Sequence, residues 1–127
     1  MNKIFYNKLI RDKIPAKLDA LGVAYEVHTL DDTEFKTALL KKIAEESGEI
    51  ALAKDRSIII AELADLIDVL EEVARVYEIS DQDIKAAQNL NKENKGGFED
   101  KIFLEWSADD GYKTNETATP KLGQAED

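Results

Sequence analysis

The sequence predicts a mainly α-helical bundle with one short pair of β-strands. Two observations support the helices: long stretches carry apolar residues at helical spacing, and residues that favour helix starts stand before each of them. A third supports the strands, because two short segments are rich in residues that favour extended structure. We therefore expect one helical domain over residues 1–107, followed by a polar and mobile tail over residues 108–127.

The N-terminal part predicts a short helix and then a strand. Pro15 is tolerated in a first helical turn and Gly22 can end the helix, so we expect this helix between them. The following "VAYEVHTL" predicts a strand at about residues 23–29.

Three further helices are expected, each marked by its first residues. Asp31 and Glu34 form a capping-box pattern before a helix at about 32–54. Asp55 or Ser57 is expected to cap the next helix, and Ser80 the last one; the predicted ranges are 57–78 and 81–94. Lys95 and two glycines end the last helix, and "KIFLEW", residues 101–106, predicts a second short strand.

Composition restricts the classes of function. The chain has 127 residues, a net charge of -10 and no cysteine. The negative charge disfavours non-specific binding to nucleic acid or to anionic membranes, and no apolar run is long enough for a membrane span, so we expect neither partner and a cytoplasmic location. Basic residues gather instead in the first 17 positions, where they suit an anionic ligand: Lys3, Lys8, Arg11, Lys13 and Lys17.

Carboxylates interrupt the apolar stripes of the two long helices. With about 100° of rotation per residue, Glu62 lies among Ile58, Leu66, Val69 and Val73, and Asp65 lies about 60° away at the edge. On the preceding helix, Glu46 shares a sector with apolar residues and Glu49 borders it. Carboxylates that face a helix interface repel one another, and a hard divalent cation such as Mg²⁺ relieves that repulsion.

A solvated acidic face is the other interpretation of the same pattern. Glu-rich helices are common, and the pairs Lys41–Glu45 and Lys42–Glu46 have the i,i+4 spacing of surface ion pairs. Spacing alone leaves a metal site and a solvated face about equally well supported.

The pattern "EESGE" at 45–49, followed after 12 residues by "ELAD" at 62–65, resembles the EExxE…ExxD signature of the MazG-like all-α nucleotide pyrophosphohydrolases. The resemblance implies that Glu46, Glu49, Glu62 and Asp65 bind Mg²⁺, with Mn²⁺ as a substitute. It also implies cleavage of a nucleoside triphosphate between its α- and β-phosphates, and dimerisation through the helical core.

Two more segments resemble the branch of that superfamily described as phosphoribosyl-ATP pyrophosphohydrolase-like. They are "YNKLIRDKIP", residues 6–15, and "KGGFEDKIFLE", residues 95–105, in which the branch would have Arg in place of Lys95. Together the three blocks span residues 6–105.

The expected reaction assigns further roles. Phosphoanhydride hydrolysis needs charge neutralisation and an oriented water. We expect the four metal ligands to act with Glu45, which can orient a water, as the catalytic carboxylates. The expected substrate-binding residues supply cations for the phosphates and an amide for base or sugar: Asn7, Lys8, Arg11, Lys13 and Lys95.

Two alternatives remain at the sequence level. One is hydrolysis of phosphoribosyl-ATP itself, although no residue is an evident reader of its second ribose phosphate. The other is an acidic helical module that binds without turnover.

The helix over 57–78 is apolar on more than one side, which requires more cover than one other long helix supplies. We therefore expect a homodimer or homotetramer built on these helices.

Overall fold

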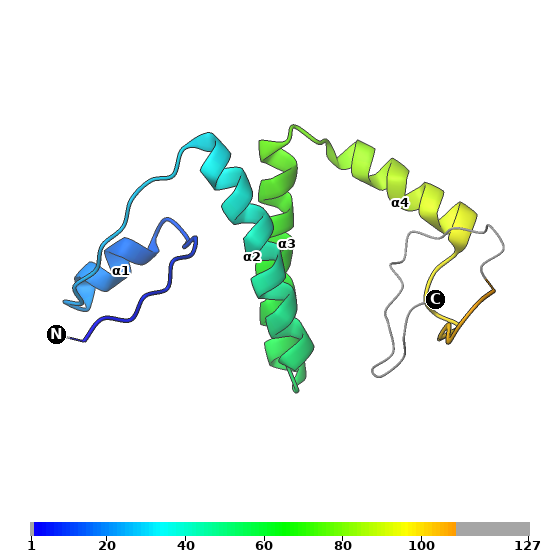
Figure 1. The fold of residues 1–127 in the computed structure, drawn as a ribbon, viewed down its shortest axis with the longest axis horizontal. Coiled ribbons are helices and arrows are strands. Elements are labelled where there is room, and N and C mark those ends of the chain that lie inside the picture. The colour runs from blue at the N-terminus through cyan, green and yellow to red at the C-terminus, as the bar shows by residue number, and fades with distance from the viewer. Residues whose placement is uncertain (1, 109–127) are drawn as a thin grey trace.

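The computed structural model describes residues 2–108 and contains four helices in that part of the chain. They are α1 (Ile14–Ala20), α2 (Asp32–Leu52), α3 (Arg56–Val76) and α4 (Asp81–Lys95). α2 and α3 form an antiparallel hairpin in the middle of the molecule (Figure 1). The N-terminal arm and α1 lie on one side of this hairpin, and α4 with the segment after it lies on the other.

The helices begin where the capping residues predict. The Asp31 carboxylate accepts a 2.8 Å hydrogen bond from the Glu34 N–H, and the Glu34 carboxylate accepts from the Asp31 N–H over 3.4 Å. Asp55 is the cap of α3, where it accepts from the Ile58 N–H over 3.0 Å. These bonds satisfy amide groups that have no partner inside the helix, which confirms the predicted starts of α2 and α3.

Residues close in the sequence also determine where α4 begins and ends. The Ser80 hydroxyl accepts a 3.1 Å hydrogen bond from the Asp83 N–H and so caps the helix. Gly96 ends it with φ of 77°, a conformation that glycine adopts without steric cost. In α1, Pro15 stands in the first turn as predicted.

The predicted strand pair is wrong for the described residues. Residues 23–29 and 101–106 contain no strand; they run on opposite sides of the α2–α3 hairpin (Figure 1). A strand exists only where a neighbour completes its hydrogen-bond ladder, and neither segment has one within the described chain. Both segments are therefore irregular, although their composition favours strands.

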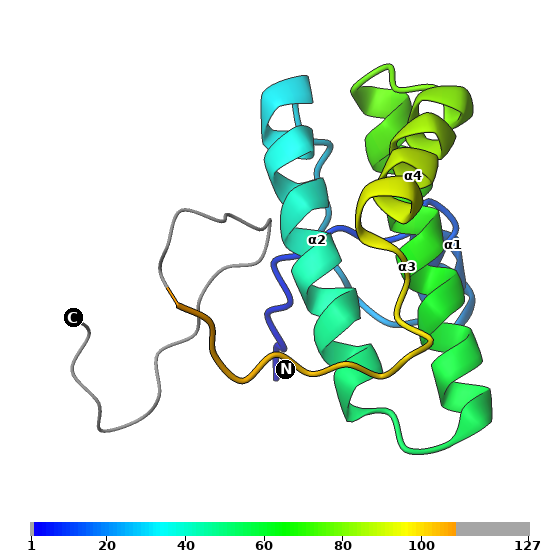
Figure 2. The same ribbon diagram turned by 90° about the vertical axis from the view of Figure 1, so that its right-hand side faces the viewer.

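The interior of the described chain is small. Leu39 on α2 is its one buried apolar side chain, and Glu46 is its one buried charged residue. Figure 2, a view turned by 90°, shows α2 and α3 side by side with α4 crossing in front of α3. The hairpin therefore places carboxylates from two helices at a common, partly shielded interface.

Within residues 2–108, no helix meets the length and hydropathy needed to cross a membrane. The predicted tail lies almost entirely outside the described residues.

Candidate metal centre

Three glutamates meet at the interface between α2 and α3. Glu46 and Glu49 come from the last two turns of α2, and Glu62 comes from the second turn of α3. One oxygen from each carboxylate lies within 4.8 Å of the others. The i,i+3 spacing on α2 and the antiparallel hairpin produce this convergence, which was predicted for these three residues.

Two oxygens of this group are buried without a partner. The Glu46 side chain is only 9% exposed, and its Oε2 has no hydrogen-bond partner in the described chain. Oε2 of Glu62 is in the same state. A carboxylate oxygen withdrawn from water needs a donor or a cation, so these two atoms are suited to ligate a hard metal ion.

The three converging glutamates, Glu46, Glu49 and Glu62, form a triad in which the charged form of Glu62 is disfavoured. Its pKa is raised above the ordinary glutamate value, chiefly because a protonated Glu62 can hydrogen-bond to the facing Glu49 carboxylate. Burial and the negative charges of Glu49, Asp65 and Glu46 act in the same direction. A divalent cation among these oxygens would remove that penalty.

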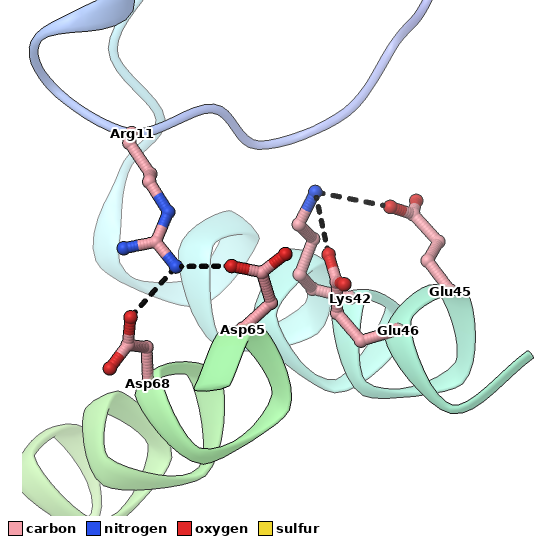
Figure 3. A network of polar contacts seen from close by, with 6 residues as sticks. All are labelled: Arg11, Lys42, Glu45, Glu46, Asp65 and Asp68. Carbon is pink, nitrogen blue, oxygen red and sulfur yellow. Dashed lines mark hydrogen bonds and ion pairs between the residues drawn. The ribbon is translucent and has the colours of Figure 1, made fainter. Parts of the chain in front are cut away.

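Lys42 supplies part of the missing countercharge from within α2. Its Nζ lies 3.6 Å from Oε1 of Glu46 and 3.4 Å from Oε2 of Glu45 (Figure 3). Glu45 thus shares Lys42 with Glu46 and is not among the converging carboxylates. The contact with Lys42 leaves the second oxygen of Glu46 free for the centre.

Asp65, the fourth predicted ligand, is not among the converging oxygens. Its Oδ1 accepts a 3.0 Å hydrogen bond from Arg11, whose same nitrogen also donates to Oδ2 of Asp68 over 2.8 Å (Figure 3). The two carboxylates raise the pKa of Arg11, with the hydrogen bond to Asp68 as the largest cause. The guanidinium pins the N-terminal arm to α3, one turn away from Glu62.

The other expected substrate residues are spread over several elements. Lys8 lies over the ring of Tyr6, with 5.7 Å from Nζ to the ring centre. Asn7 has φ of 47°, and Lys13 directly precedes α1. Lys95 ends α4, which packs against none of the other three helices. Of the five residues, Arg11 alone has an ion pair with α3 in the described chain.

Asp68, the second partner of Arg11, was not among the predicted site residues. The available signal was its position three residues after Asp65, which places both carboxylates on adjacent turns of one face. Nothing in the local sequence identified Arg11 as their partner.

Comparisons with models of protein families, with curated proteins and with solved structures find no match to this chain.

Proposed function

We propose that this protein is a Mg²⁺-dependent nucleotide pyrophosphohydrolase of the MazG-like type. The observation that carries the proposal is the convergence of Glu46, Glu49 and Glu62, two of whose oxygens are buried without a partner. Three carboxylates with no nitrogen or sulfur donor suit Mg²⁺ or Mn²⁺, which prefer oxygen ligands. The proposed reaction adds water to a nucleoside triphosphate, breaks the bridge between the α- and β-phosphates, and releases a nucleoside monophosphate and pyrophosphate.

Each carboxylate has a role in this scheme. The bound ion would supply positive charge where negative charge develops on the phosphate oxygens. Glu46, Glu49 and Glu62 would hold it, and the contact between Lys42 and Oε1 of Glu46 would keep that side chain in place. Glu45, at the same lysine, orients an attacking water at the rim of the centre.

Arg11 links substrate binding to the metal centre. Its guanidinium is shared between Asp65 and Asp68. A phosphate offers the same planar donor group a charged acceptor with two oxygens, so an incoming nucleotide competes for it. With Arg11 on a phosphate, Asp65 would be available as a fourth ligand beside the three glutamates.

The basic arm provides the rest of the proposed clamp. Lys8 and Lys13 flank Arg11 on the same arm and contribute cationic charge, and Asn7 contributes an amide for base or sugar. Lys95 belongs to α4, so we assign it a phosphate contact only in an assembled oligomer. The proposal thus combines an acidic centre with a cationic arm, which an anionic substrate carrying a divalent ion requires.

Pyrophosphate release tests this proposal. Purified protein with Mg²⁺ or Mn²⁺ is offered canonical, oxidised and methylated nucleoside triphosphates, and phosphoribosyl-ATP. We expect release from at least one nucleoside triphosphate, abolished in Glu49→Gln and retained in Glu71→Gln, a change of an exposed acid on α3 outside the triad.

Two other results have defined meanings. Release from phosphoribosyl-ATP alone would assign the narrower activity of the related branch. No release from any of these compounds would contradict the enzymatic proposal and favour a binding module.

A further inference from the structure

The N-terminal arm, residues 2–13, is tied to α3 by one side chain. Nη2 of Arg11 lies 3.0 Å from Oδ1 of Asp65 and 2.8 Å from Oδ2 of Asp68 (Figure 3). In the described part of the chain, no other ion pair or side-chain hydrogen bond joins the arm to a helix. α1, which follows the arm, packs against none of the other three helices. The position of the arm on α3 therefore depends on Arg11.

Packing does not hold the arm in place. The arm contains no helix or strand, so its backbone lacks a repeating set of hydrogen bonds. Most of its large apolar side chains are exposed in the described chain: Ile4, Phe5, Tyr6 and Ile10. A segment with few buried apolar contacts and no regular backbone bonding opens at a low free-energy cost. The arm can therefore leave α3 once the Arg11 contact is broken.

The Arg11 contact is itself easy to exchange. The Arg11 side chain is 60% exposed, and those of Asp65 and Asp68 are 44% and 52% exposed. Ion pairs that water reaches to this extent contribute little net stability, because both partners are well solvated when they separate. A competing cation can therefore take Asp65 from Arg11 at little cost.

A divalent ion in the triad would be such a competitor. Asp65 follows Glu62 by three residues, on the adjacent turn of α3, and its negative charge contributes to the raised pKa of Glu62. An ion bound to Glu62 would attract the Asp65 carboxylate and repel the Arg11 guanidinium. Both effects weaken the contact that holds the arm.

Asp68 takes part in holding the arm and not in the converging group of carboxylates. It accepts the shorter of the two hydrogen bonds from Arg11, and this bond is the largest cause of the raised pKa of Arg11. Its oxygens are not among those that meet at the triad. A change at Asp68 therefore alters the arm contact and leaves the ligand set intact.

We propose that the Arg11 bridge is a latch: it holds the N-terminal arm on α3, and a divalent ion bound at the triad opens it. The open arm then presents its cations, Lys8, Arg11 and Lys13, to an anionic ligand. Cation loading thereby controls whether the arm can bind phosphate, and by reciprocity an anion bound to Arg11 strengthens cation binding by the same factor. The inference rests on the metal centre of the proposed function and is independent of hydrolysis.

NMR of the arginine side chains observes the latch directly, with Mg²⁺ alone as the probe. The chain has three arginines, so the other two serve as internal references. Arg75 forms an ion pair with Glu72, and Arg56 has none in the described chain. In EDTA we expect the guanidinium N–H signals of Arg11 to be sharp and resolved, as in Arg75, because ion pairing hinders rotation. With Mg²⁺ they should become like those of Arg56, backbone order over residues 2–13 should fall, and Arg75 should not change.

The backbone amide shifts of the triad glutamates show in the same titration whether Mg²⁺ has bound. Shifts in the triad with an unchanged Arg11 and an unchanged arm would overturn the latch and leave the metal centre and the proposed function intact. Absence of shifts in the triad would contradict the metal centre, and with it both the latch and the proposed function.

Asp68→Asn tests the latch from the side of α3. The variant weakens the hold on Arg11 and leaves all four proposed ligands in place. The latch predicts an arm that is mobile in EDTA and a Mg²⁺ affinity a few-fold above that of wild type. Glu71→Gln is the charge-matched control, because it also removes one negative charge from an exposed position on α3, and it should keep the wild-type affinity. Loss of charge alone would lower the affinity for a cation, so only the release of Asp65 explains a rise.

Circular dichroism establishes that both variants are folded. A Mg²⁺ affinity of Asp68→Asn equal to or below that of Glu71→Gln would overturn the proposal. If Asp68→Asn does not fold, the NMR titration of the wild-type protein still decides.

Discussion

Arg11 and Asp65 lie 54 positions apart in the sequence, and the Arg11 guanidinium donates a 3.0 Å hydrogen bond to the Asp65 carboxylate. The same nitrogen reaches Asp68 over 2.8 Å. The pair joins the cationic arm to the helix that carries Glu62. Arg11 therefore competes with a metal ion for Asp65, whereas Asp65 and Asp68 compete with the substrate phosphates for Arg11.

Arg11→Ala should affect metal and nucleotide in opposite directions. Removing the guanidinium frees Asp65, so Mn²⁺ affinity in the absence of nucleotide should rise by a few-fold. Loss of a charged hydrogen bond to phosphate should raise KM by about tenfold or more. If the contact tightens as the anhydride breaks, kcat falls as well.

Arg75→Ala is the matched control, because Arg75 also forms an exposed ion pair on α3, with Glu72. Calorimetric Mn²⁺ titration and steady-state kinetics of both variants test the prediction. A fall in both Mn²⁺ affinity and KM in Arg11→Ala would contradict the competition.

Glu62→Gln should change how stability depends on pH in the metal-free protein. The folded-state pKa of Glu62 is raised, so its contribution favours folding below the ordinary glutamate pKa of about 4.3. That contribution is lost as pH rises through the raised pKa. Gln mimics the protonated form, so metal-free Glu62→Gln should melt higher than wild type at neutral pH.

The difference in Tm between the two proteins should shrink as pH falls toward 4. Thermal melts in EDTA across pH 4–8 measure it. A variant that melts lower than wild type at neutral pH would show that the Glu62 charge is not a burden in the metal-free fold.

Lys42→Met should make the fold more dependent on metal. Lys42 is the partner of the buried Glu46 carboxylate, so its loss leaves that charge uncompensated and should cost up to about 3 kcal/mol of metal-free stability. Added Mg²⁺ should restore more stability than it gives to wild type. Lys41 is an exposed neighbour on α2, so Lys41→Met should behave like wild type in chemical denaturation with and without Mg²⁺. If Mg²⁺ stabilised wild type, Lys42→Met and Lys41→Met equally, the role given to Lys42 would be contradicted.

Divalent cations should raise the melting temperature of the wild-type protein. An ion that binds the folded triad and not the unfolded chain stabilises by mass action. At a concentration 100 times its Kd, the gain is about 2.7 kcal/mol. Scanning calorimetry with Mg²⁺, Mn²⁺ and EDTA should show this rise in melting temperature, and Glu62→Gln should lose most of it. A melting curve unchanged over a wide range of metal concentration would be inconsistent with the metal centre.

The parts of the molecule that sequence predicted are those fixed by local interactions. Asp31, Asp55 and Ser80 bond to amides three residues away, so their caps can be recognised from neighbouring residues. The convergence of Glu46, Glu49 and Glu62 follows from helical periodicity and a short connection between two long helices. The caps depend on residues three positions apart, and the convergence depends on two consecutive helices.

The parts that sequence missed depend on distant contacts. The ion pairs of Arg11 depend on where an irregular arm lies, which no periodic pattern encodes. The strands expected at 23–29 and 101–106 required a neighbour that the described chain does not supply. Lys42 serves both Glu45 and Glu46, a choice that rotamers decide after the helix has formed.

Direct titration of Mn²⁺ into metal-free protein tests the central claim, that the three glutamates form a divalent-cation site. The account predicts saturable binding in wild type, binding at least about tenfold weaker in Glu46→Gln and Glu49→Gln, and unchanged binding in Glu71→Gln, with all three variants folded. Equal Mn²⁺ affinity in wild type and in the two triad variants, or no saturable binding in any of them, would contradict it.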